Sequence, residues 1–433
     1  MKFANHHYLA LATIIMSILI SQSRRATAQN DLDKAPIQYS TADVGDPVAR
    51  LSEQLGSGER ELEFEKKFGY LKSVLEALEI PTSSQSLVFS KTSLQLSRIS
   101  PRRPRALYFN DDVYVGYCQN GDVLEIAATD PKQGAIFYTL SQKETAEPKF
   151  KRDNGSCLTC HATNRTQRVP GYLVRSVFPD AAGRPLFRKG TFTSDHTSPF
   201  NERWGGWYVS GTHGSMGHMG NVVCRDDDEP FDYASGANDL DLSDNFRTEK
   251  YLTPHSDIAA LMVLEHQTQM HNALAAANYE TRRALHQSFS MNELLGRPEG
   301  TISELAERRI ESSAERVLKH LLFCDEFPLT DQIRGSSSFA NEFVARGKPD
   351  SRGRSLRDFE MKTRMFRYPC SYLIHSEAFA SLPDPVRIQV LRRLKKILNS
   401  AKTSAEFAHL TRETKRDITA ILMDTHPEFA RLD

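Results

Sequence analysis

Cysteine is scarce in this 433-residue chain, and only one close pair occurs among its six cysteines. Cys118, Cys224, Cys324 and Cys370 stand singly along the sequence. A structural zinc site normally needs a second close pair of ligands, so this scatter argues against such a site. In an oxidising compartment the four single cysteines could form up to two disulfides, and the sequence does not choose among the three full pairings.

A net charge is absent as well, because 55 Lys and Arg residues balance 55 Asp and Glu residues. No whole-molecule field draws the chain towards nucleic acid or anionic lipid, and we expect no nucleic-acid partner. Repeats and low-complexity tracts are also missing. With 39% hydrophobic and 25% charged residues, the composition is that of a globular protein with one large domain or two.

Long apolar runs are missing except near the start. A run from Tyr8 to Ile20 follows a basic beginning, and a small-x-small motif ends at Ala28. The run is too short to span a bilayer comfortably. We therefore expect residues 1–28 to be a signal peptide that is cleaved after Ala28, and the mature protein to be periplasmic. Membrane association would follow only if this segment, with Arg24 and Arg25 before the cleavage site, is retained as an anchor.

The close cysteine pair belongs to Cys157-Leu158-Thr159-Cys160-His161, and Cys-x-x-Cys-His is the site of covalent haem attachment in c-type cytochromes. The spacing puts both thiols on one helical turn, with the adjacent imidazole directed at the iron. We expect one haem c per chain, held by Cys157 and Cys160, with His161 as the proximal iron ligand. A redox dithiol or half of a zinc site is the alternative, but the polar lead-in at 151–156 is typical of a loop rather than of the strand that precedes a thioredoxin-like dithiol.

Hydrophobic periodicity predicts an α+β fold, with a β-rich haem-bearing region followed by a mainly α-helical C-terminal region. The expected regions are a signal peptide (1–28), an N-terminal linker and helix (29–100), the β-rich region that carries the covalent haem motif (101–250) and the helical region (251–433). The expected strands are 106–109, 113–117, 123–128, 135–140, 172–178, 186–193 and 207–209. The expected helices are 59–78, a helix with Ser256 as its N-cap, 301–323 and 385–398, with a long loop at 335–357.

The second axial position of the iron decides between electron transfer and catalysis. Four possible ligands crowd into the Gly-rich segment 211–221, namely His213, Met216, His218 and Met219. The glycines would let the backbone approach a porphyrin closely. We favour His218 and Met219 as distal metal ligands. The alternative is a Gly-rich turn whose His and Met side chains only pack or bond to the backbone.

A second candidate for the distal ligand is the helix that carries Met262, His266 and Met270, which share one face at four-residue spacing. Such a stripe is more often part of a hydrophobic core. The neighbouring His271 is expected at the solvent edge.

Both tryptophans, Trp204 and Trp207, follow a polar segment and could form a wall of a haem pocket. Arg203 or Arg175 could pair with a haem propionate, and His196 could act as a distal acid or base if the iron is open. An ordinary aromatic core with surface charges is the alternative.

These motifs together resemble a family of exported bacterial mono-haem c-type cytochromes, the cytochrome c domain-containing proteins. The resemblance rests on the Cys157 to His161 motif and on three downstream stretches, Arg203 to Tyr208, Gly211 to Gly214 and His218 to Asn221. It implies haem binding and an electron-transfer role, carried over to Cys157, Cys160 and His161.

Our hypothesis from the sequence is a periplasmic c-type cytochrome with one covalently bound haem, which relays single electrons between redox partner proteins. One alternative is a haem enzyme, peroxidase-like or another oxidoreductase, with an open distal site. This is motivated by the length of the chain and by the histidines downstream of the motif. A further alternative is a haem-based sensor or docking protein whose helical half binds a partner.

Overall fold

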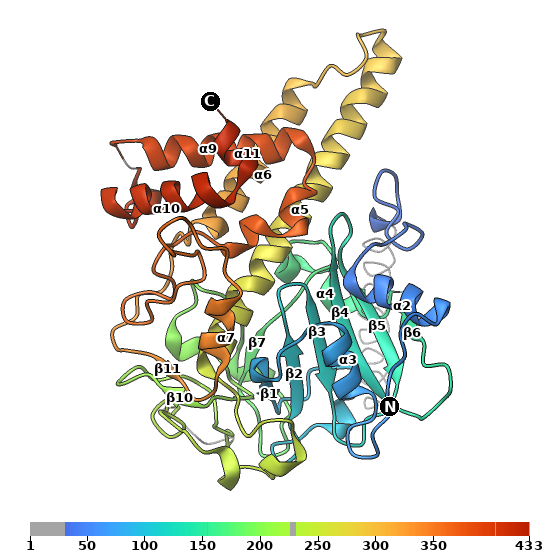
Figure 1. Cartoon of the computed structure of the whole chain (residues 1–433), viewed down its shortest axis with the longest axis vertical. Coiled ribbons are helices and arrows are strands. Elements are labelled where there is room, and N and C mark those ends of the chain that lie inside the picture. The colour runs from blue at the N-terminus through green and yellow to red at the C-terminus, as the bar shows by residue number, and fades with distance from the viewer. Residues whose placement is uncertain (1–30, 154, 226–230, 403, 433) are drawn as a thin grey trace, which may run out of the picture.

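A computed structural model describes residues 31–153, 155–225, 231–402 and 404–432. The fold is α+β, as predicted, with a large antiparallel sheet in the N-terminal half and a helical C-terminal region (Figure 1). The expected signal peptide, 1–28, lies outside the described residues. Its cleavage therefore stays a prediction.

The large sheet has seven strands in the order β6-β5-β4-β3-β2-β1-β9. Its four central strands lie within two residues of the predicted ones, because alternating apolar residues between short polar turns specify both the strands and their hairpins. The bounds are β1 Ser86–Val88, β2 Arg105–Phe109, β3 Val113–Tyr117, β4 Val123–Asp130, β5 Gly134–Ser141, β6 Phe150–Arg152 and β9 Trp207–Tyr208.

Two short pairs of strands lie outside this sheet. β7 (Arg175–Val177) pairs with β8 (Thr191–Thr193), and β10 (Gly211–Thr212) pairs with β11 (Arg334–Gly335). The expected strand at 186–193 is therefore mostly wrong, because residues 187–189 form a 3-10 turn that ends at Gly190.

The two faces of the large sheet are covered by different parts of the chain. On one face, the Tyr138 hydroxyl donates to Asp46, which is the N-cap of α2 (Pro47–Ser57). On the other face, the Tyr114 hydroxyl accepts from Gln267 of α5 (Ile258–Leu295). Figure 1 shows α2 and α3 in front of the sheet and α5 behind it.

The N-terminal helix is shorter than predicted. Helix α3 covers only Leu71–Ala77, and residues 59–70 are not helical. The backbone groups of Glu65 and Gly69 exchange two hydrogen bonds, of 2.9 and 2.7 Å, and Gly69 has a φ of 60°. This tight turn ends any helical path through the apolar pattern, because left-handed backbone is incompatible with a helix.

Helix α5 is the longest element, with 38 residues, and most of its residues as far as Asn292 are buried. It runs through the middle of the molecule and forms a projecting hairpin with α6 (Figure 1). The helices after it are α6 Glu304–Leu321, α7 Phe339–Ala345, α8 Glu377–Ala380, α9 Asp384–Asn399, α10 Arg412–Thr425 and α11 Pro427–Arg431. The loop predicted at 335–357 is wrong in part, because it contains α7.

The scattered cysteines Cys118, Cys324 and Cys370 are buried and form no disulfide. Burial raises the pKa of the Cys118 and Cys324 thiols to about 12. Within the ranges that the structure describes, no helix combines the length and apolar character needed to cross a membrane.

The start of α5 generates a stability prediction. The buried Asp257 carboxylate accepts from the amides of Ala259 and Ala260 and from the amide and hydroxyl of Ser337. Asp257→Ala removes this cap and leaves Ser337 without its acceptor, so we expect a loss of about 2–4 kcal/mol in the free energy of unfolding. Urea unfolding at neutral pH measures the loss.

The matched control is Asp241→Ala, because the exposed Asp241 caps only the surface turn Leu242–Asp244. We expect this change to cost less than about 1 kcal/mol. Equal losses for the two variants would contradict the anchoring role of Asp257.

Candidate functional site

The Cys-x-x-Cys-His motif forms the single helical turn α4 (Leu158–His161), with Cys157 at its N-terminal end. The amides of Cys160 and His161 both donate to the Cys157 carbonyl, at 3.1 and 3.0 Å. Residues three and four positions apart lie on one helix face, so both thiols and the imidazole share that face. The Asp153 carboxylate fixes the start of the turn by accepting from the Cys157 amide at 2.9 Å. The predicted single turn is confirmed.

The state of the cysteines bears on the alternative chemistry of the pair. Cys157 is half-buried, Cys160 is exposed, and the two sulfurs are not joined in a disulfide. Burial, with a contribution from the Asp153 carboxylate, raises the pKa of the Cys157 thiol to about 12. A redox dithiol needs a readily formed thiolate, so this environment argues against that reading.

The His161 ring is oriented by a pair of reciprocal hydrogen bonds. Its Nδ1 lies 2.9 Å from the Gly171 carbonyl oxygen, and the Gly171 amide donates to the His161 carbonyl at 2.9 Å. Because a carbonyl can only accept, Nδ1 must carry the proton, which leaves the lone pair on Nε2. Burial lowers the pKa of His161, so the ring is neutral. This tautomer is the one that a haem-ligating histidine needs.

Gly171 is held in turn by α5. The Asn272 side chain accepts from the Tyr172 amide at 2.8 Å and donates to the Tyr172 carbonyl at 2.8 Å. A Cβ on Gly171 would lie 2.2 Å from the Asn272 side-chain oxygen, so only glycine fits. Sequence reasoning missed both residues. The signals available were the Pro170-Gly171 turn and an asparagine inside an otherwise apolar helical run.

The surroundings of the motif supply apolar surface. Leu94, Leu96 and Phe187 are 62%, 52% and 59% exposed, and they are the exposed large apolar side chains among residues 31–222 of the described chain. Leu94 and Leu96 flank Gln95, which contacts Glu125, a residue whose charge acts on Cys157 and His161. The Arg175 guanidinium lies 5.0 Å from the Phe187 ring, and Cys160 lies near enough to influence its pKa.

The residues around the motif fit a haem on these grounds. Apolar side chains that are left in water beside the two cysteines would cover a porphyrin, whose faces are apolar. The half-buried Arg175 could meet a propionate. Across the described part of the chain, no group of three or more His, Cys, Asp or Glu residues is arranged to hold a metal ion without a cofactor.

The structure places the candidate distal ligands in a separate buried segment. His218 packs against Trp204 and His213, with ring centroids 5.3 and 4.7 Å away. Its Nδ1 accepts from the Gly220 amide at 3.0 Å, so the neutral ring carries its proton on Nε2. That tautomer has no lone pair on Nε2 for iron.

Met219 has a different environment. Its sulfur accepts only a long hydrogen bond, of 3.6 Å, from the Ser176 hydroxyl in β7, next to Arg175. In the part of the chain that the structure describes, neither His218 nor Met219 shares a hydrogen bond or a ring contact with His161. The structure therefore brings together Cys157, Cys160 and His161, and it leaves the distal residues on a neighbouring segment.

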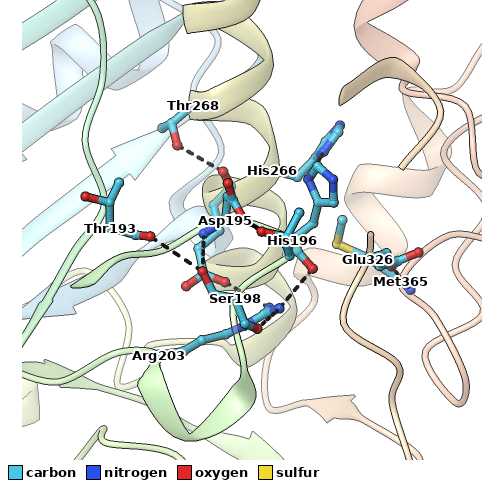
Figure 2. Close-up of polar contacts among 11 residues, drawn as sticks. Thr193, Asp195, His196, Ser198, Arg203, His266, Thr268, Glu326 and Met365 are labelled. Atoms are coloured by element: carbon cyan, nitrogen blue, oxygen red, sulfur yellow. Dashed lines mark hydrogen bonds and ion pairs between the residues drawn. The ribbon is translucent and has the colours of Figure 1, made fainter. Parts of the chain in front are cut away.

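A buried polar cluster occupies the region around His196 and Arg203 (Figure 2). Arg203 forms a 3.1 Å ion pair with Glu265 of α5, and these side chains are 3% and 0% exposed. Arg203 also donates to the carbonyls of His196 and Ser198. It is therefore engaged inside the protein, which leaves Arg175 as the better candidate for a propionate. The sequence did not indicate Glu265.

The histidines of this cluster are engaged with each other. His196 Nδ1 lies 3.3 Å from His266 Nδ1, and His266 Nε2 lies 2.8 Å from the Ser371 hydroxyl. His196 is only 4% exposed, so the role of a distal acid or base has no support from its position. His271 is buried and bonds to the Asp111 carbonyl at 2.7 Å. The expectation of a solvent-edge position for His271 is wrong.

Comparison of the chain with protein-family models, with curated proteins and with solved structures gave no match.

The buried His196 gives a testable pH dependence. Burial lowers its pKa to about 3, whereas an unfolded histidine titrates near 6.5. Between these values the unfolded chain binds the extra proton, so this residue lowers stability as the pH falls below 6.5. His196→Gln should therefore reduce the difference in unfolding free energy between pH 7 and pH 5 by about 2 kcal/mol.

Urea unfolding at the two pH values measures this difference for the wild type and the variant. His286→Gln, at an exposed position of α5, is the control and should leave the difference as it is in the wild type. The buried, neutral state of His196 is contradicted if the two variants behave alike.

Proposed function

We propose that this protein is a periplasmic c-type cytochrome that carries one covalently bound haem and relays single electrons. The observation that carries the proposal is the His161 ring, which is fixed by Gly171 with Nε2 free on the same turn as two unlinked thiols. A metal-ligating histidine characteristically donates its other ring N–H to such a carbonyl.

Each residue of the site has a distinct role in this proposal. Cys157 and Cys160 hold the porphyrin through thioether bonds, and His161 supplies Nε2 to the iron. Arg175 pairs with a propionate, and Phe187 covers an edge of the ring. When bound, the haem supplies a one-electron iron couple whose potential depends on its axial ligands and burial.

For the second axial position we favour Met219 over His218. The Met219 thioether is buried and makes one weak contact, with Ser176 of the strand that also carries Arg175. His218 would have to move its proton to Nδ1, which would then face the Gly220 N–H donor. Two donors directed at each other repel, so the local backbone opposes this ligand.

The export signal and the haem motif support each other in this proposal. Haem is attached to Cys-x-x-Cys-His on the outer side of the bacterial inner membrane, and the expected signal peptide at 1–28 would take the chain there. Redox partner proteins then serve as donor and acceptor.

Optical spectra of the purified holoprotein test the proposal. We expect a low-spin, six-coordinate haem in both oxidation states that carbon monoxide and peroxide leave unchanged, because both axial positions are filled. Met219→Ala should open one position, with loss of the low-spin bands and gain of carbon monoxide binding. His218→Ala should keep the low-spin spectrum.

Met216→Ala is the matched control, because Met216 is a buried methionine of the same segment. It should also keep the low-spin spectrum. A high-spin ferric wild type that reacts with peroxide would overturn the electron carrier in favour of a haem enzyme. Retention of the low-spin bands in Met219→Ala would overturn this choice of ligand.

A further inference from the structure

A cavity of about 200 Å³ lies away from the Cys157 to His161 turn, where the β2–β3 turn meets the end of α7 and the segment 372–377. Ligand pockets for drug-sized molecules usually measure about 300–1,000 Å³, so this cavity suits a smaller molecule. Its ionisable lining residues are Asp111, Asp112, Arg346, Lys348, Arg357, His375 and Glu377.

The floor of the cavity is rigid and carries no net charge. Arg357 is 7% exposed and forms an ion pair with Asp111. Its guanidinium carbon also lies 4.2 Å from the Tyr372 ring centroid and 4.6 Å from that of Phe343. A guanidinium fixed by a carboxylate and two rings is preorganised.

The remaining charges leave the cavity positive. Glu377 is paired with Arg50 at 3.6 Å. Arg346 and Lys348 are exposed at the mouth, and the described residues place no carboxylate within ion-pair distance of either. Arg346 lies near enough to influence the pKa of Tyr372, which places its charge towards the cavity. Two cations without carboxylate partners attract an anion.

The two other titratable side chains add little negative charge. Burial raises the pKa of Asp112 to about 7, so part of this carboxyl is protonated at neutral pH. Burial lowers the pKa of His375 to about 3, so its ring is neutral. The protonated Asp112 carboxyl can donate a hydrogen bond to an anion.

The rest of the lining is apolar and comes from Leu356, Leu373 and the Tyr372 ring. An inorganic anion would make no use of this surface, whereas a compact organic acid would cover it. We propose that this cavity binds a small organic carboxylate. Its carboxylate lies between Arg346 and Lys348, and its apolar body lies against Tyr372.

Isothermal titration calorimetry of the matured full-length protein tests this site, with benzoate and inorganic phosphate as probes. We expect benzoate to bind with one-to-one stoichiometry and phosphate to bind at least tenfold more weakly. Arg346→Gln and Lys348→Gln should each weaken benzoate about tenfold or more, because each removes a charge-assisted contact. Both side chains are exposed, so the variants should keep the wild-type thermal unfolding curve.

Arg102→Gln is the matched control, because Arg102 is an exposed cation before β2 and outside the cavity lining. It should leave benzoate binding at the wild-type value. Absence of benzoate binding would overturn the proposal, as would phosphate binding tighter than benzoate or equal benzoate affinity in all three variants. None of these results depends on the haem assignment, which the optical spectra test separately.

Discussion

The arrangement of the site depends on the two hydrogen bonds that His161 and Gly171 exchange. One of them sets the tautomer of the ring, and the other ties the end of the motif turn to the following segment. Neither bond is local to the motif, because Asn272 of α5 positions Gly171 by holding both backbone groups of Tyr172. A buried amide with all its partners present rigidifies its surroundings, and losing one partner is costly.

Helix α5 performs the same task for other parts of the chain. Its buried polar side chains each bond to a different segment. Gln267 joins Tyr114 to Tyr372, and Glu265 holds Arg203. A helix that is buried on all sides must satisfy its polar groups through such partners, so they fix how the sheet, the Gly-rich segment and the C-terminal helices meet. The proposed haem site and the carboxylate cavity both lie against elements that α5 positions.

The sequence predicted what is local and failed where distant contacts decide. The sheet hairpins and the motif turn follow from short-range patterns, and the structure has them. The helix expected at 59–78 fails because a turn closed by Gly69 interrupts its apolar pattern. The cap of α5 is Asp257 rather than Ser256, because the Ser256 hydroxyl bonds instead to the Tyr208 carbonyl of β9. Asn272 supports the site from about a hundred residues away, and no short-range pattern contains that contact.

The most direct test is the intact mass of the mature protein, produced in a host that attaches haem to a reference c-type cytochrome. The account predicts a chain that begins after Ala28 and is heavier than its polypeptide by one haem. It also predicts that a proteolytic fragment spanning Cys157 to His161 retains this extra mass after denaturation, because thioether bonds survive unfolding. A mature chain with the bare polypeptide mass, from a host that matures the reference protein, would contradict the account.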